Sequence, residues 1–171
     1  MSHAISDELL KRFDIPGPRY TSYPTADRFV EAFTEADYIQ ALEQRRAGSL
    51  ALPLSLYVHI PFCESVCYYC ACNKVITKHH ERATEYLHAL DTEIDLHTAE
   101  LGTGQQVSQL HLGGGTPTFL SDGELSGLMA SLRRAFTLTA AAEISIEVDP
   151  RTATPQRLKH LHDIGFNRLS F

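Results

Sequence analysis

The sequence of 171 residues lacks any apolar run long enough to span a bilayer. Its N-terminus, MSHAISDELLKRF, also lacks the order of basic, apolar and small residues that marks a signal peptide. The formal net charge is −6 without a cluster of Lys or Arg, whereas a nucleic-acid partner normally leaves a basic stripe. These absences predict a soluble cytoplasmic protein that binds neither nucleic acid nor a membrane, and we expect a monomer.

Cysteine is also scarce, and all four cysteines stand in the stretch CESVCYYCAC, at Cys63, Cys67, Cys70 and Cys72. Disulfides at this spacing would close only trivial loops, and a chain without a secretion signal is expected in a reducing compartment. Structural zinc uses four thiolates, but it usually takes two ligands from each of two separated loops. A single run of C-x3-C-x2-C instead suits three corners of a 4Fe-4S cluster with one iron open to a ligand. The spacing favours the cluster and leaves zinc open.

Alternating and helical patterns predict three successive strand-helix units. Strands are expected at LSLYVHIP, SQLHLGGG and EISIEVDP, where aliphatic residues alternate with polar ones. The first helix is expected to end at Gly102, and the second to begin with a capping box of Ser121 and Glu124. Its buried stripe is expected to reach Phe136, and the third helix to begin at Thr154. This succession predicts an α/β fold with a parallel sheet.

Two domains are predicted along the chain. Residues 1–50 form an N-terminal extension with two short helical patterns, the second opened by Thr34 and closed near Gly48, around the segment PGPRYTSYPTA. Residues 51–171 form the α/β domain. The chain stops at NRLSF, a predicted fourth strand with no helix after it, and a sheet that ends there has an unpaired edge. We therefore expect a fragment of a longer protein.

The predicted strands carry polar side chains opposite their aliphatic face. These residues are Tyr57, His59, His111, Ser145, Glu147 and Asp149. A barrel filled only for stability prefers branched aliphatics there, so the polar face predicts a ligand cavity, with a hydrogen-bonded polar core as the alternative. In parallel α/β folds the working loops follow the strand C-termini, where the cysteine loop, Gly113–Gly115 and Glu147 all fall.

Several motifs together resemble a known family. The C-x3-C-x2-C run after the first strand and GGGTPT after the second are similar to motifs of radical S-adenosylmethionine enzymes. Cys72, the Asn73-Lys74 that follows it, GPRYTSYPTA and EISIEVDP resemble, within that superfamily, the oxygen-independent coproporphyrinogen III oxidases of heme biosynthesis. The resemblance covers nearly the whole chain. It implies a partial (β/α) barrel of about three strand-helix units and the start of a fourth strand, behind an N-terminal helical extension.

The resemblance also implies which residues form the site. Cys63, Cys67 and Cys70 would hold a 4Fe-4S cluster, and two molecules of S-adenosylmethionine would bind near it. The residues expected at the cluster-bound molecule are Tyr57, Gly114 and Glu147. Those expected nearer the second are Tyr69, Cys72, Gly115 and Thr116, so that Cys72 is not a cluster ligand. Tyr69 stands where phenylalanine is expected, and Ala71 where glycine is usual.

The activity implied by the resemblance is an oxidative decarboxylation. A 5′-deoxyadenosyl radical abstracts hydrogen from a propionate of coproporphyrinogen III, carbon dioxide leaves, and a vinyl group remains. Two propionates react in this way to give protoporphyrinogen IX, with electrons from an unidentified donor. The segment GPRYTSYPTA would be a lid with Arg19 available to a propionate, or else a packing segment. Because the rest of the barrel and a C-terminal domain are absent, we expect the fragment alone to be inactive.

Two other functions stay open. A heme-binding chaperone of the same superfamily shares the three-cysteine motif but lacks the fourth cysteine at this spacing and the GPRYTSYPTA segment. A structural zinc module on four thiolates is the non-enzyme alternative. Heme titration tests the first, and metal analysis after anaerobic reconstitution tests the second.

Overall fold

The structure, a computed structural model, describes residues 6–14, 28–48, 52–68, 70 and 72–171. The chain divides into two compact units, Met1–Tyr38 and Ile39–Phe171. The helix α1 (Asp7–Phe13) is capped by the hydroxyl of Ser6. The helix α2 (Glu35–Ala47) follows Thr34, the residue at which the sequence predicts the second helix to open. The segment PGPRYTSYPTA, with Arg19, lies outside the described residues.

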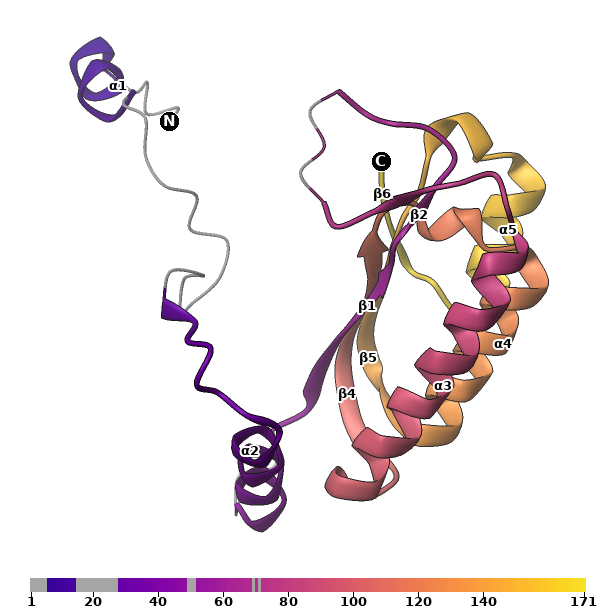
Figure 1. Cartoon of the computed structure of the whole chain (residues 1–171). Coiled ribbons are helices and arrows are strands. Elements are labelled where there is room, and N and C mark those ends of the chain that lie inside the picture. The colour runs from indigo at the N-terminus through magenta and orange to yellow at the C-terminus, as the bar shows by residue number, and fades with distance from the viewer. Residues whose placement is uncertain (1–5, 15–27, 49–51, 69, 71) are drawn as a thin grey trace. The chain divides into compact units, whose positions relative to one another are not determined.

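A four-stranded parallel sheet forms the centre of the second unit. In sheet order its strands are β1 (Leu54–Ile60), β4 (Gln105–Gly114), β5 (Phe136–Glu147) and β6 (Arg168–Ser170). The helices that connect them are α3 (Glu81–Leu101), α4 (Asp122–Ala135) and α5 (Pro155–Asp163). These helices lie along one face of the sheet, with the carboxyl ends of the strands at the top of Figure 1. The predicted succession of strand-helix units and the parallel sheet are confirmed.

Aliphatic side chains of the strands pack against the helices in one core. The fully buried members include Ile60, Leu110, Leu112, Leu125, Met129, Ile146 and Leu161. Burying a side chain of this size contributes about 1.5–3 kcal/mol relative to leaving it in water. Tyr57, next to this core in the sequence of β1, is 59% exposed, as expected for the opposite side of an alternating strand. The core therefore holds the sheet rigid beneath its polar face.

The second helix ends differently from the prediction. Its capping box is confirmed, because Ser121 Oγ accepts from the Glu124 N–H at 3.3 Å and the Glu124 carboxylate accepts from the Ser121 N–H at 2.8 Å. Phe136 is buried, but it has an extended backbone (φ −127°, ψ 157°) and begins β5. The strand starts there, and not at Glu143, because its first residues pair with Gln105 and its neighbours in β4.

The last strand is attached to the sheet by a side chain. Asn167 Oδ1 accepts from the Ile144 N–H and its Nδ2 donates to the Ala142 carbonyl, both at 2.8 Å. The Asn167 N–H also donates to the Ile144 carbonyl at 2.9 Å. These bonds bring NRLSF alongside β5, with Arg168 opposite Ser145. The predicted fourth strand is confirmed: it pairs with β5 in parallel, and the Asn167 side chain adds two hydrogen bonds at its start.

No helix in the described ranges is both long enough and apolar enough to cross a membrane.

Candidate active site

The cysteine loop is closed at its base by a short parallel strand pair. These strands are β2 (Phe62–Cys63) and β3 (Val75–Ile76), and the N–H of Thr77 donates to the Cys63 carbonyl at 2.9 Å. The loop follows the end of β1 and arches over the top of the sheet in Figure 1. Its two stems are therefore held together where the working loops of a parallel α/β fold lie.

The loop that follows β4 runs beside the first stem of the cysteine loop. The N–H of Gly115 donates to the Ile60 carbonyl, and that of Thr116 to the Phe62 carbonyl, both at 2.8 Å. The hydroxyl of Thr116 also donates to Cys63 Sγ at 3.4 Å. The structure thus brings together Cys63, Gly115 and Thr116, three residues that the sequence places in the site.

All four cysteines are free thiols, and they differ in environment. Cys63 is buried, Cys70 is partly buried, and Cys67 and Cys72 are exposed. A hydrogen bond from the Cys72 backbone lowers the pKa of the Cys70 thiol, whereas desolvation and the nearby Cys70 raise the pKa of Cys72. Within the described residues no three His, Cys, Asp or Glu side chains come close enough to hold a metal ion. One loop carries the three predicted ligands, but it does not gather them at one point.

A chain of hydrogen bonds connects β1 to the far end of the cysteine loop. His59 Nε2 lies 2.9 Å from the Asn73 carbonyl, which can only accept, so Nε2 carries the proton. His59 Nδ1 lies 3.1 Å from the Tyr57 hydroxyl. Lys74 Nζ donates to the carbonyls of Cys70 and Cys72 at 3.3 and 3.4 Å. The sequence analysis assigned no structural role to Asn73 or Lys74. Their bonds involve backbone carbonyls, of Asn73 itself and of Cys70 and Cys72, and no pattern of side chains predicts such bonds.

Glu147 lies at the centre of the polar face. Its Oε2 accepts from the Gly114 N–H at 3.1 Å, and its Oε1 lies 3.5 Å from His111 Nε2. His111 Nδ1 is 2.7 Å from Ser145 Oγ, and the Tyr57 ring stacks on the His111 ring at a centroid distance of 5.8 Å. The alternation of the strands therefore brings Tyr57, Gly114 and Glu147 together, as the sequence predicts.

Burial and neighbouring negative charges also act on Tyr57. Desolvation raises the pKa of the Tyr57 phenol, and the negative charges of Glu147 and Cys72 raise it further. The phenol is thus kept neutral, so that it can donate a hydrogen bond beside a carboxylate. A hollow of about 240 Å³ continues along the same face, lined by His111, Ser145 and neighbouring polar residues.

Two glycines without side chains, Gly113 and Gly114, form the end of β4 next to these polar residues. A Cβ at Gly113 would lie 2.9 Å from His111 Nε2, 3.0 Å from the Tyr57 ring and 3.1 Å from Glu147 Oε1. Gly114 has φ +114°, a conformation that other residues rarely adopt. The backbone can therefore approach a ligand held by these side chains more closely than a chain with side chains could.

Gly115 is required by the packing of the chain itself. A Cβ there would lie 2.7 Å from the Pro61 carbonyl oxygen and 2.8 Å from that of Phe62, and backbone atoms cannot move aside cheaply. We expect Gly115→Ala to lower the free energy of unfolding by about 1–3 kcal/mol, the usual cost of overpacking. Chemical denaturation measures this change.

Two glycines on α4 provide the matched control for that substitution. A Cβ at Gly123 or Gly127 meets nothing within 4 Å, so an alanine there should stabilise the helix by about 0.5–1 kcal/mol. Equal effects of alanine at Gly115 and Gly127 would show that the loop after β4 is not tightly packed.

The sequence also singled out Tyr69 and Asp149. Tyr69 lies outside the described residues, as does Ala71. Asp149 was expected on the polar face, but it follows the end of β5 and its carboxylate binds the Arg151 side chain at 2.6 Å. Because β5 ends at Glu147, Asp149 lies beyond the strand that was expected to carry it.

Comparison with known proteins identifies the family. The radical SAM superfamily matches residues 57–171. The oxygen-independent coproporphyrinogen III oxidase of Escherichia coli (strain K12) is 52% identical over 162 residues, which are 95% of this chain and 34% of that protein. The protein of the same description from Mannheimia haemolytica is 48% identical over 151 residues, which are 88% of this chain and 100% of that sequence.

A solved structure agrees with these matches. The coproporphyrinogen III oxidase HemN of Escherichia coli, described as a radical SAM enzyme, has a TM-score of 0.81 and 50% identity, covering 95% of this chain and 35% of that one. This likeness confirms the predicted partial barrel. The chain spans about a third of the length of several curated relatives that it matches. The chain belongs to the radical SAM superfamily and, within it, to the family of the oxygen-independent coproporphyrinogen III oxidases.

Proposed function

We propose that the intact protein converts two propionates of coproporphyrinogen III to vinyl groups without oxygen, giving protoporphyrinogen IX. The observation that carries the proposal is the 52% identity, over 95% of the chain, to an oxidase of that description. The polar face supports it, because a carboxylate, a phenol and bare backbone converge beside the cysteine loop.

The metal ligands in this proposal are Cys63, Cys67 and Cys70. Membership of the radical SAM superfamily implies a 4Fe-4S cluster and S-adenosylmethionine. Soft thiolates are the ligands that such clusters use, and the lowered pKa of Cys70 favours its thiolate. Since metal sites are rarely formed in full before binding, these three thiolates would come together when the cluster binds, while the β2–β3 pair holds the two stems of the loop.

The chain's own residues would bind and orient S-adenosylmethionine. When bound, the cluster and S-adenosylmethionine supply the 5′-deoxyadenosyl radical that attacks the propionate. Glu147 keeps 43% of its side chain exposed after accepting from Gly114, so its carboxylate has lone pairs free for ribose hydroxyls or an ammonium group. Tyr57 belongs to the same binding site. Its phenol stays neutral beside the Glu147 carboxylate, so that its hydroxyl can donate a hydrogen bond to the ligand.

A second molecule of S-adenosylmethionine belongs to the same proposal. Its binding residues would be Tyr69, Cys72, Gly115 and Thr116. Gly115 and Thr116 lie beside the first stem of the cysteine loop, with their N–H groups bonded to Ile60 and Phe62. A second ligand bound by these residues would therefore lie next to the cysteine loop.

Turnover by the intact protein tests the proposal. After anaerobic reconstitution, a one-electron reductant, S-adenosylmethionine and coproporphyrinogen III should yield a divinyl product and release of about two carbon dioxide molecules for each porphyrinogen. Cys67→Ala serves as the inactive control. Tight heme binding without decarboxylation would point to a heme-binding chaperone, and uptake of zinc in place of iron would point to a structural module.

A further inference from the structure

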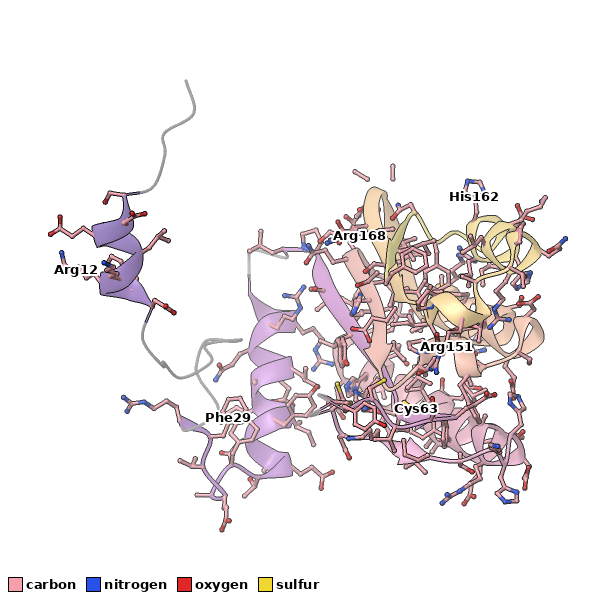
Figure 2. All side chains as sticks on the ribbon, turned by 90° about the horizontal axis from the view of Figure 1, so that it is seen from above. Arg12, Phe29, Cys63, Arg151, His162 and Arg168 are labelled. Carbon is pink, nitrogen blue, oxygen red and sulfur yellow. The ribbon has the colours of Figure 1, made fainter. Side chains whose placement is uncertain are left out.

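The cysteine loop is also held by a residue that follows β5, at the same carboxyl edge of the sheet. Arg151 lies in the short 3-10 helix η3 (Pro150–Thr152) that follows β5, and its Nη2 donates to Ser65 Oγ at 3.1 Å. Ser65 stands between Cys63 and Cys67, and 86 residues separate it from Arg151. Arg151 and Cys63 are both labelled in Figure 2, which views the chain from above. The Arg151 side chain thus links the end of β5 to the Cys63–Cys67 part of the cysteine loop, called here its first arm.

The Asp149 carboxylate fixes the direction of the Arg151 side chain. The Asp149 carboxylate accepts from Arg151 Nε at 2.9 Å, from Nη2 at 2.6 Å and from the Arg151 N–H at 2.9 Å. The Asp149 side chain is only 16% exposed, and its own N–H donates to Thr118 Oγ1 at 3.4 Å. A forked guanidinium on a carboxylate has a well-defined direction, so Arg151 is aimed at the loop by its anchor.

The guanidinium also brings a positive charge to the loop. The hydrogen bond and charge of Asp149 raise the pKa of Arg151, and the charged side chain reaches Ser65, which lies two residues from both Cys63 and Cys67. A neighbouring cation favours the more negative of two charge states. Reducing a cluster by one electron adds one negative charge, so a cation at this position favours the reduced cluster.

We propose that Arg151, anchored by Asp149, is a positioning residue that fixes the Cys63–Cys67 arm of the cysteine loop through Ser65 and places a positive charge beside the cluster carried by that loop. This inference rests on the proposed function for the cluster itself. The hold on the arm does not depend on the cluster, because the bonds exist between side chains of the chain alone.

The test compares Arg151→Gln with Ser65→Ala in the intact protein. Both variants lose the bond to the arm, but only the first loses the charge. In the cluster-free protein both should speed hydrogen exchange in residues 63–67 by roughly three- to tenfold, the effect of losing one hydrogen bond of ordinary strength, since the Arg151 side chain is 68% exposed. In the reconstituted protein both should lose iron to a chelator faster, and Arg151→Gln alone should shift the midpoint potential to a more negative value.

Arg134→Gln is the matched control. Arg134 is similarly exposed and faces Asp95 at 3.8 Å, at the end of α4 that precedes β5 and so away from the cysteine loop. Arg151→Gln with the same loop exchange and iron loss as Arg134→Gln would overturn the positioning role. An unchanged midpoint potential in Arg151→Gln would overturn the role of its charge. If the unsubstituted protein takes up no cluster, the proposed function fails, while the exchange comparison still decides whether Arg151 holds the arm.

Discussion

Alanine at Cys63, Cys67 or Cys70 should abolish the iron-sulfur cluster, whereas Cys72→Ala should retain it. We expect reconstitution of the unsubstituted protein to give about four irons per chain, the content of one 4Fe-4S cluster. Each of the three ligands holds one iron, so that removing a thiolate leaves an open corner. Iron and sulfide analysis, together with visible absorption, measures the result.

Cys70→Ala and Cys72→Ala form the most informative pair. The two residues are separated by a single position and lie in the same loop, and their thiols have pKa values shifted in opposite directions. Loss of the cluster in both variants would remove the distinction between Cys72 and the ligands. Binding of one zinc ion that requires all four thiols would instead support a structural zinc site.

Glu147→Gln should weaken the binding of S-adenosylmethionine and leave the cluster content unchanged. A carboxylate that accepts from two hydroxyls makes charge-assisted bonds, which gives a loss of roughly 1.5–3 kcal/mol per bond weakened, at most. Because 43% of the Glu147 side chain is exposed, we expect a value near the lower limit. Calorimetric titration of the reconstituted intact protein measures the affinity.

The competing role for Glu147 is structural, and the same variant tests it. Its carboxylate already accepts from the Gly114 N–H at 3.1 Å and lies 3.5 Å from His111. If these contacts are its main purpose, the variant should unfold at lower temperature with nearly unchanged affinity. Glu143→Gln is the control, since Glu143 is equally exposed on the same strand but pairs with Arg168. In the Glu143→Gln variant, neither the affinity for S-adenosylmethionine nor the cluster content should change.

The positions of the helices and strands were largely predictable from local patterns. Strand alternation at Tyr57 and Val58, the capping box of Ser121 and Glu124, and the glycine after α3 all act over a few residues. These signals depend on the chemistry of neighbouring side chains, which the sequence states directly. The predicted start of β5 was wrong because the first residues of the strand are fixed by pairing with β4, and the residues near Phe136 give no sign of that pairing.

The sequence by itself determined the kind of chemistry this protein can carry: three cysteines at fixed spacing, a glycine-rich turn and a carboxylate, each at the end of a strand. Only the tertiary structure decided how these parts meet. Pairing of β2 with β3, the bond of His59 to Asn73 and the reach of Arg151 to Ser65 join segments distant in sequence. Such contacts follow from the packing of the whole sheet, because hydrogen bonds form only between groups that the fold has already brought within about 3 Å.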